Sequence, residues 1–165
     1  MSRYELAQLN IGVAKGPIDS AVMADFVANL ERINALAERS PGFVWRLQTE
    51  EGDATALRPL DDDTLINMSV WKDVTSLRNF VYRTAHADIM VRRREWFERM
   101  AASHMVLWWV REGHRPTIGE AISRLDLLHR DGPTPEAFLF RQAYPAPGEM
   151  RLDAPFDIGG ECPAL

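Results

Sequence analysis

The chain has 165 residues, and with 46% hydrophobic and 26% charged residues its composition is typical of one globular domain rather than a disordered chain or a coiled coil. Its formal net charge of -5 argues against a nucleic-acid-binding protein, because such domains are usually basic. The only cysteine is Cys162, so no disulfide forms within the chain, and no apolar run approaches the roughly 18 residues of a membrane span. The N-terminus also lacks the pattern of a signal peptide. We therefore expect a cytoplasmic protein with no nucleic-acid or membrane partner.

The first fifty residues predict a strand, a helix and a second strand. A short apolar run predicts a strand over residues 4–13, and a turn at Lys15-Gly16-Pro17 closes it. Apolar residues spaced three and four apart then follow the capping pair Asp19-Ser20. This spacing predicts an amphipathic helix that ends at Ser40-Pro41-Gly42, and residues 43–49 predict the second strand.

The next sixty residues predict a long loop, a third strand, a second helical region and a fourth strand. Residues 50–64 are too polar for a core and predict a hairpin loop, which is followed by a strand over 65–71. A helical region with a break is expected over 74–100. Residues 105–110 are apolar throughout and predict a strand that is covered on both faces.

The last part of the chain predicts a third helix and a tail. Thr117 and Glu120 form a capping box for a helix over about 117–131. Residues 138–141 predict either a short strand or a docked arm. We expect one domain over residues 1–147 and an extended or disordered, proline-rich tail over 148–165.

The order strand-helix-strand-strand-helix-strand predicts an α+β, ferredoxin-like fold with a four-stranded antiparallel sheet and helices on one face. The second and third strands are apolar on both faces, so the open face of the sheet needs a cover. A second copy of the sheet would supply it, which predicts a homodimer. The alternative is that the third helix and the tail cover this face.

Several strings of residues resemble a known family. They include INALAERSPGFVWRLQ at 33–48, RREWFERM at 93–100, LWWV at 107–110 and GHRPT at 113–117. Together they resemble the uncharacterised bacterial family called domain of unknown function 3291, over roughly residues 3–147. That family is similar to the dimeric α/β-barrel superfamily, which contains antibiotic-biosynthesis and haem-degrading monooxygenases. The resemblance implies the barrel fold and the dimer, but it implies no particular reaction.

His86 is the first candidate functional residue. It follows Trp71 by fifteen residues, where several barrel relatives have a functional histidine. Helical spacing places it on one face with Met90, Arg93 and Phe97, which suits an anionic, hydrophobic ligand. The alternative is a histidine that caps a helix or is satisfied within the core.

Asn10 is the second candidate. The haem-degrading relatives use an asparagine on the first strand, a tryptophan on the second helix and a later histidine. Asn10 and His86 match two of these, but Phe80 stands at the tryptophan position. The missing indole argues against haem cleavage and leaves haem binding open. The alternative role of Asn10 is that of a turn residue at a strand end.

Tryptophans are the remaining candidates, because five of them are many for this length. Trp108 and Trp109 are adjacent in a strand and must point to opposite faces. Most of the tryptophans are expected in the core. The alternative is an aromatic pocket for a flat ligand, with Trp71, Phe80 and Trp108 as its walls.

The sequence lacks phosphate-binding, dinucleotide-binding, zinc-hydrolase and nucleophile-elbow motifs, and it predicts no metal site. We expect a protein that binds a small hydrophobic or aromatic molecule. One hypothesis is a cofactor-independent oxygenase acting on an anionic substrate, in which His86 is the base or a ligand contact, Asn10 a polar anchor and Arg93 the neutralising cation. The other is a non-catalytic dimer that binds a ligand or haem. Whether the protein is an enzyme stays open in the sequence.

Overall fold

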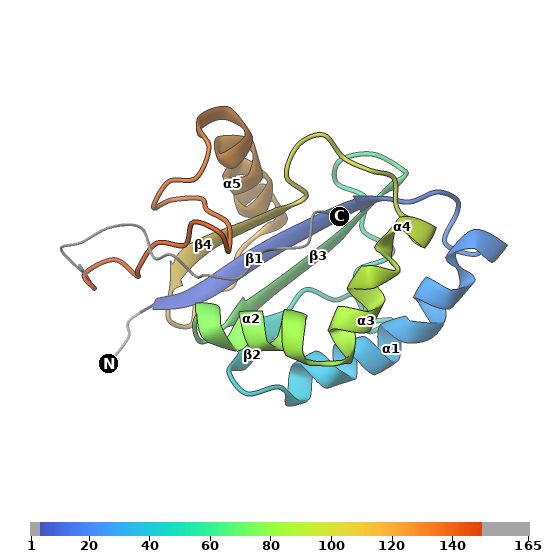
Figure 1. The fold of residues 1–165 in the computed structure, drawn as a ribbon, viewed down its shortest axis with the longest axis horizontal. Helices are drawn as coiled ribbons and strands as arrows, with labels where there is room; N and C mark the ends of the chain where they lie inside the picture. The colour runs from blue at the N-terminus through green and yellow to red at the C-terminus, as the bar shows by residue number, and fades with distance from the viewer. Residues whose placement is uncertain (1–3, 150–165) are drawn as a thin grey trace.

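The computed structural model describes residues 4–149. These residues form a four-stranded antiparallel sheet in the order β2-β3-β1-β4 (Figure 1). Its strands are β1 (Tyr4–Val13), β2 (Phe43–Arg46), β3 (Thr64–Trp71) and β4 (Met105–Arg111). With the helices between them, this order is the ferredoxin-like arrangement, so the predicted fold class is confirmed. The second strand is shorter than the predicted range 43–49.

Helices follow the predicted positions with two breaks. They are α1 (Ala24–Arg39), α2 (Val74–Arg83), α3 (Ala85–Val91), α4 (Arg93–Trp96) and α5 (Ile118–Asp131). A 3-10 turn, Ala21–Met23, precedes α1. The break between α2 and α3 lies at Thr84, whose backbone is extended and whose hydroxyl accepts a hydrogen bond from the His86 amide. Thr84 therefore ends one helix and caps the next.

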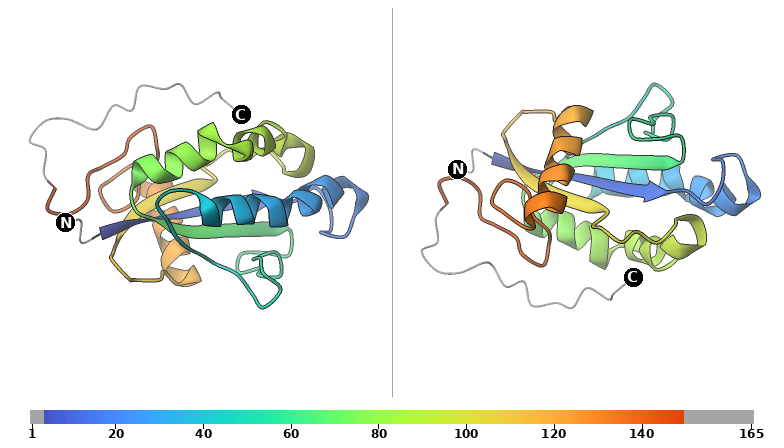
Figure 2. Two further views of the ribbon diagram at one scale, coloured as in Figure 1. Left: turned by 90° about the horizontal axis from the view of Figure 1, so that it is seen from below. Right: turned by 90° about the horizontal axis from the view of Figure 1, so that it is seen from above.

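The two faces of the sheet are covered by different helices, as the two views in Figure 2 show. Helices α1 to α4 lie over one face, and α5 lies over β1 and β4 on the other. Alternate residues of each strand therefore belong to different layers. In β1, Ala7 and Leu9 belong to the core under α5, whereas Leu6 belongs to the core under α2.

Helix α5 covers the sheet face that was expected to need a second chain. Its Ala121, Leu125 and Leu128 pack on a core in which Met68 and Trp108 are buried within one chain. Thr117 caps the helix as predicted, since its hydroxyl accepts a hydrogen bond from the Glu120 amide at 3.1 Å. The structure therefore shows the alternative in which the third helix covers this face. The homodimer stays a prediction.

The segment after α5 is a docked arm rather than a strand of the sheet. Phe138 exchanges two backbone hydrogen bonds with Leu107, of 2.8 and 2.9 Å, and its side chain is fully buried. The arm therefore covers the outer edge of β4, where unpaired backbone groups would otherwise be exposed. Of the predicted tail, residues 150–165 lie outside the described part of the chain.

Between residues 4 and 149, no helix combines the length and the apolar character needed to cross a membrane.

Candidate functional site

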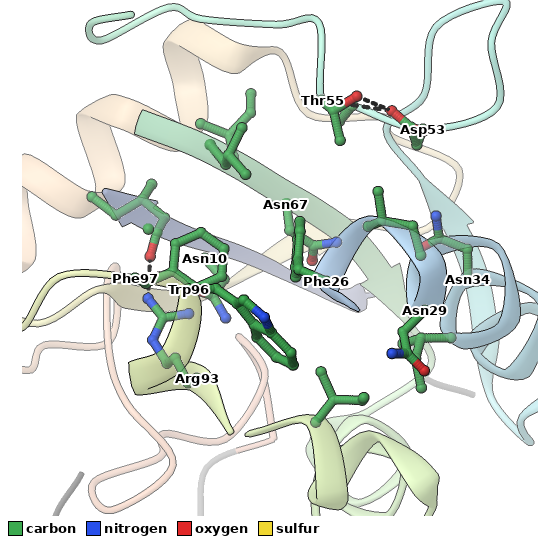
Figure 3. Close-up of a pocket in the computed structure, with 18 of the residues that line it drawn as sticks. Asn10, Phe26, Asn29, Asn34, Asp53, Thr55, Asn67, Arg93, Trp96 and Phe97 are labelled. Carbon is green, nitrogen blue, oxygen red and sulfur yellow. Dashed lines mark hydrogen bonds between the residues drawn. The ribbon is translucent and has the colours of Figure 1, made fainter. Parts of the chain in front are cut away.

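An open cavity lies between α1 and the pair α3–α4, with β1 and β3 as its floor (Figure 3). It encloses about 970 Å³, counting the space at its mouth. The cavity exists because α1 stands off the sheet: of the described residues in this sixteen-residue helix, only Ala37 is buried. At the cavity floor, β1 and β3 carry the polar pair Asn10 and Asn67 next to Gly12 and Leu65. The lining is nevertheless largely apolar, which is typical of sites for small organic ligands.

Two asparagines form the polar floor. Asn10 on β1 and Asn67 on β3 are direct cross-strand partners, and both line the cavity. The Gln8 amide nitrogen donates to Asn67 Oδ1 at 2.7 Å and to Ser69 Oγ at 2.9 Å, and Trp71 Nε1 also donates to Ser69 Oγ. Because the Asn67 oxygen already accepts a bond from Gln8, its amide N–H groups are the part available to a ligand oxygen.

His86 enters the cavity from the first turn of α3. Its Nδ1 lies 3.3 Å from the Val81 carbonyl oxygen, and its ring packs against Phe80 at 4.8 Å between centroids. A carbonyl can only accept, so the proton belongs on Nδ1 and Nε2 is left as the acceptor. Burial lowers the pKa of His86 below 6.5, which keeps the imidazole neutral at pH 7.

Arg93 is the cation at the other end of this wall. Its Nη2 donates to the Ile11 carbonyl oxygen at 2.7 Å, and its guanidinium lies 4.9 Å from the centre of the Phe97 ring. Burial lowers the pKa of the Arg93 guanidinium below its ordinary value, but an arginine remains charged in proteins. None of the ion pairs found within residues 4–149 includes Arg93. A half-buried cation without a carboxylate partner favours an anionic ligand.

The opposite wall is satisfied within the chain. Arg46 donates to Glu38 Oε1 at 2.9 Å and to the Gly52 carbonyl oxygen at 2.7 Å. Asp53 accepts bonds from the amide and the hydroxyl of Thr55. These charged groups already have partners, so Arg93 is the stronger attraction for a ligand anion.

The structure brings five of the predicted site residues together at the cavity. Asn10, His86, Met90, Arg93 and Phe97 all line it. This grouping agrees with the expected helical stripe, although α3 ends at Val91 and Phe97 has an extended backbone.

Three predicted wall residues do not line the cavity. Trp71 and Phe80 stack on each other at 5.1 Å between ring centroids in the neighbouring core, and only Phe80 approaches the cavity, through its contact with His86. Trp108 lies on the opposite face of the sheet, where its Nε1 donates to Glu120 Oε1 at 3.0 Å. Trp108 therefore cannot form a wall of this cavity. Trp109 points to the other face, as strand alternation requires.

Several residues that line the cavity were not predicted from the sequence. Asn67 and Ser69 are polar residues in a largely apolar strand, and their period-two spacing with Trp71 was a usable signal. Asn34 on α1 lies in a helix whose apolar residues were expected to pack on the sheet. The sequence carried no signal that α1 would stand away from it.

The lining fits haem poorly. A porphyrin carries two propionates, whereas Arg93 is the lining cation that lacks a carboxylate partner among the described residues. Phe80 has no N–H to donate and does not line the cavity. Within residues 4–149, no three histidine, cysteine, aspartate or glutamate side chains are grouped to hold a metal ion. No step through haem or a metal follows from this geometry.

A family model described as Domain of unknown function (DUF3291) matches residues 5–154, which agrees with the resemblance of the sequence strings. No curated protein matches the sequence. Among solved structures, SnoaB, a cofactor-independent oxygenase from Streptomyces nogalater, is 18% identical with a TM-score of 0.45, and the match covers 69% of this chain and 96% of that chain. NE2512, a protein of unknown function from Nitrosomonas europaea, is 16% identical with a TM-score of 0.41, covering 70% and 95%.

Proposed function

The chain belongs to the family of domain of unknown function 3291, and we propose that it binds a flat, largely apolar small molecule that carries an acidic group. One observation carries the proposal: an open, mainly apolar cavity holds a cation without a carboxylate partner in the described chain and a neutral histidine. The apolar lining would bind the body of the ligand, and Arg93 would balance its charge. Asn10 and Asn67 offer hydrogen bonds to its oxygens.

A fluorescent probe tests the binding. N-phenyl-1-naphthylamine is neutral and flat, and its fluorescence should rise when it enters the cavity. Leu30→Trp places a large side chain on the cavity side of α1, whereas Val27→Trp places the same side chain on the exposed side of that helix. We expect the first variant to lose most of the signal and the second to keep it. Equal signals from both variants would show that the probe binds elsewhere and would overturn the proposal.

The reaction that this site would suit is the addition of O₂ to an electron-rich phenol or enol without a cofactor. Nε2 of neutral His86 would accept the hydroxyl proton, and Arg93 would stabilise the anion that forms. The delocalised anion would then reduce O₂ to the peroxide level as a carbon–oxygen bond forms. Return of the proton from His86 gives a hydroperoxide, so substrate and O₂ combine with all atoms accounted for.

Oxygen consumption separates the catalytic function from simple binding. Wild-type protein with a bound naphthol should consume O₂ faster than the naphthol alone, and His86→Gln should lose this excess. His114→Gln is the matched control, because His114 lies at the exposed turn after β4 and bonds to Glu120. Binding without O₂ consumption would leave a ligand-binding protein. A Soret band in the purified protein would instead identify the haem-binding alternative.

We also propose a homodimer in solution, and the family resemblance supports it. The sheet face opposite the cavity gives no support for a dimer, because α5 already covers it within one chain. Light scattering at micromolar concentration should give about twice the chain mass of 18.8 kDa. A mass equal to one chain would overturn this proposal and leave the binding site unaffected.

A further inference from the structure

The guanidinium of Arg93 is fixed on two sides. One side stacks on the ring of Phe97 at 4.9 Å, and one edge donates through Nη2 to the Ile11 carbonyl oxygen at 2.7 Å (Figure 3). A guanidinium has five N–H donors in a rigid plane, and one hydrogen of Nη2 is used here. A long side chain that is normally mobile therefore has its orientation set before any ligand arrives.

Gly12 allows this arrangement. A Cβ atom at Gly12 would lie 2.6 Å from Cδ1 of Phe97, closer than such contacts allow. The ring therefore lies directly on the backbone of β1. Phe97 also pairs with Ala14 across a β-bridge and meets the ring of Phe26 edge to face at 5.1 Å. The glycine thus lets Phe97 come close enough to the strand to support Arg93 beside the Ile11 carbonyl.

The free part of this guanidinium matches a planar group with two oxygens. Carboxylates accept two parallel N–H bonds from an arginine, and the fixed plane sets the plane of the bound group. A phenolate has a single oxygen and uses only part of this geometry. Residues 4–149 supply no carboxylate to Arg93, so the position is available to a ligand.

We infer that the Arg93 corner is a carboxylate-binding subsite, that Gly12 and Phe97 are its positioning residues, and that the ligand is an aromatic carboxylate. The inference rests on the proposed function and narrows its ligand class. The carboxylate lies on Arg93, the aromatic body lies along the apolar lining, and an acidic hydroxyl, where present, lies toward His86.

His104 supplies an internal reporter for this subsite. Burial, and then the charge of Arg93, lower the pKa of His104 to about 4. A carboxylate bound to Arg93 would offset the charge of Arg93 and would leave the effect of burial unchanged. The pKa of His104 should therefore rise when a carboxylate binds, and it should not respond to a neutral ligand of the same shape.

The experiment uses 1-naphthoate and 1-naphthamide, which have the same ring but differ in charge. Both are titrated against the full chain as competitors of N-phenyl-1-naphthylamine. Wild-type protein should bind the naphthoate about tenfold or more tightly than the amide, the scale of a hydrogen-bonded charge pair. Arg93→Gln should remove that preference, because it should weaken naphthoate binding much more than naphthamide binding. Arg94→Gln is the matched control, because Arg94 is exposed on the same short helix and should keep the preference.

The ratio of naphthoate affinity to naphthamide affinity also tests the positioning residues Gly12 and Phe97. Phe97→Leu removes the stacking surface and should lower the preference several-fold, whereas Phe97→Tyr keeps the ring and should restore it. Gly12→Ala should act like Phe97→Leu, because it displaces the ring. If Gly12→Ala does not fold, the Phe97 pair still decides the question. Titration of His104 by NMR, with and without naphthoate, gives a readout that a purely structural role would not change.

The outcomes separate the inference from the function on which it rests. Equal affinity for naphthoate and naphthamide, with normal binding of both, would overturn the carboxylate subsite and leave the cavity as a binding site. Failure of both to bind would overturn the proposed function itself. A preference that survives Phe97→Leu would overturn the positioning role and leave Arg93 as the anchor.

Discussion

The two faces of one sheet have opposite characters in this molecule. Under α5, the strands contribute only apolar side chains to a closed core, such as Leu9, Met68 and Trp108, which are at most 1% exposed. On the other face, the alternate residues Gln8, Asn10, Asn67 and Ser69 are polar, and Asn10 and Asn67 line an open cavity (Figure 3). The same strands therefore supply both a stabilising core and a binding surface, and strand alternation separates the two.

The two helices show the same contrast. Both α1 and α5 are amphipathic, yet α5 buries three residues against the sheet, and α1 buries only Ala37 among those described. The apolar residues Phe26, Leu30 and Ile33 of α1 line the cavity and are only partly buried, although Phe26 and Ile33 also pack on neighbouring core clusters. This contrast predicts that mutations under α5 cost stability and that mutations under α1 change ligand binding.

The largest change in stability is expected for Leu125→Ala. Leu125 is 3% exposed and packs in the closed core under α5, so its truncation leaves a cavity. We expect a loss of about 2–5 kcal/mol in the free energy of unfolding, measured by denaturant titration. Binding of N-phenyl-1-naphthylamine per folded molecule should not change. A loss below about 1 kcal/mol would mean that the face under α5 is not the stabilising one.

An intermediate effect on stability is expected when the pH is lowered. It comes from His104, whose pKa is lowered by burial and by the charge of Arg93. The pKa of His104 is about 4 in the folded protein and 6.5 for an unperturbed histidine. The unfolded chain therefore binds this proton first, so stability falls as pH decreases from about 6.5 to 4. The full shift corresponds to at most about 3 kcal/mol. Because His104 is only half-buried, solvent screening reduces the expected loss to about 1–2 kcal/mol.

Urea titrations at pH 7 and pH 4.5 measure this effect. His104→Gln should lose less stability than wild type between these two pH values. Leu125→Ala is the control. It removes an apolar group, so it should lower the free energy of unfolding by the same amount at both pH values. Identical pH dependence in wild type and His104→Gln would show that His104 is not the group responsible.

Much of the fold was predictable from the sequence, because local signals coincided with the final elements. The strand over 4–13, the helix beginning after Thr117 and the break in the second helical region all follow from periodicity or capping. The face covered by α5 could not be assigned, since periodicity shows that a helix has an apolar side but not which surface it meets.

The site was predictable only in part, for a related physical reason. His86, Met90 and Arg93 share local helical spacing, and Asn10 came from the family resemblance; all four line the cavity. Trp108 was misplaced because an aromatic residue in a strand serves either face equally well. The floor residue Asn67 depends on the register between β1 and β3, which is a long-range property.

The smallest stability effect is expected for His86→Gln, and it tests the open face most directly. His86 makes one long hydrogen bond, of 3.3 Å, to the Val81 carbonyl oxygen, and a glutamine amide can donate to the same oxygen. We therefore expect a loss of at most about 1 kcal/mol in the free energy of unfolding. Binding of 2-naphthol should weaken, because the variant lacks Nε2 as a proton acceptor. Both quantities are measured on one preparation, with His114→Gln as the control. Easier unfolding by several kcal/mol together with normal naphthol binding would show that His86 belongs to the core and not to the site.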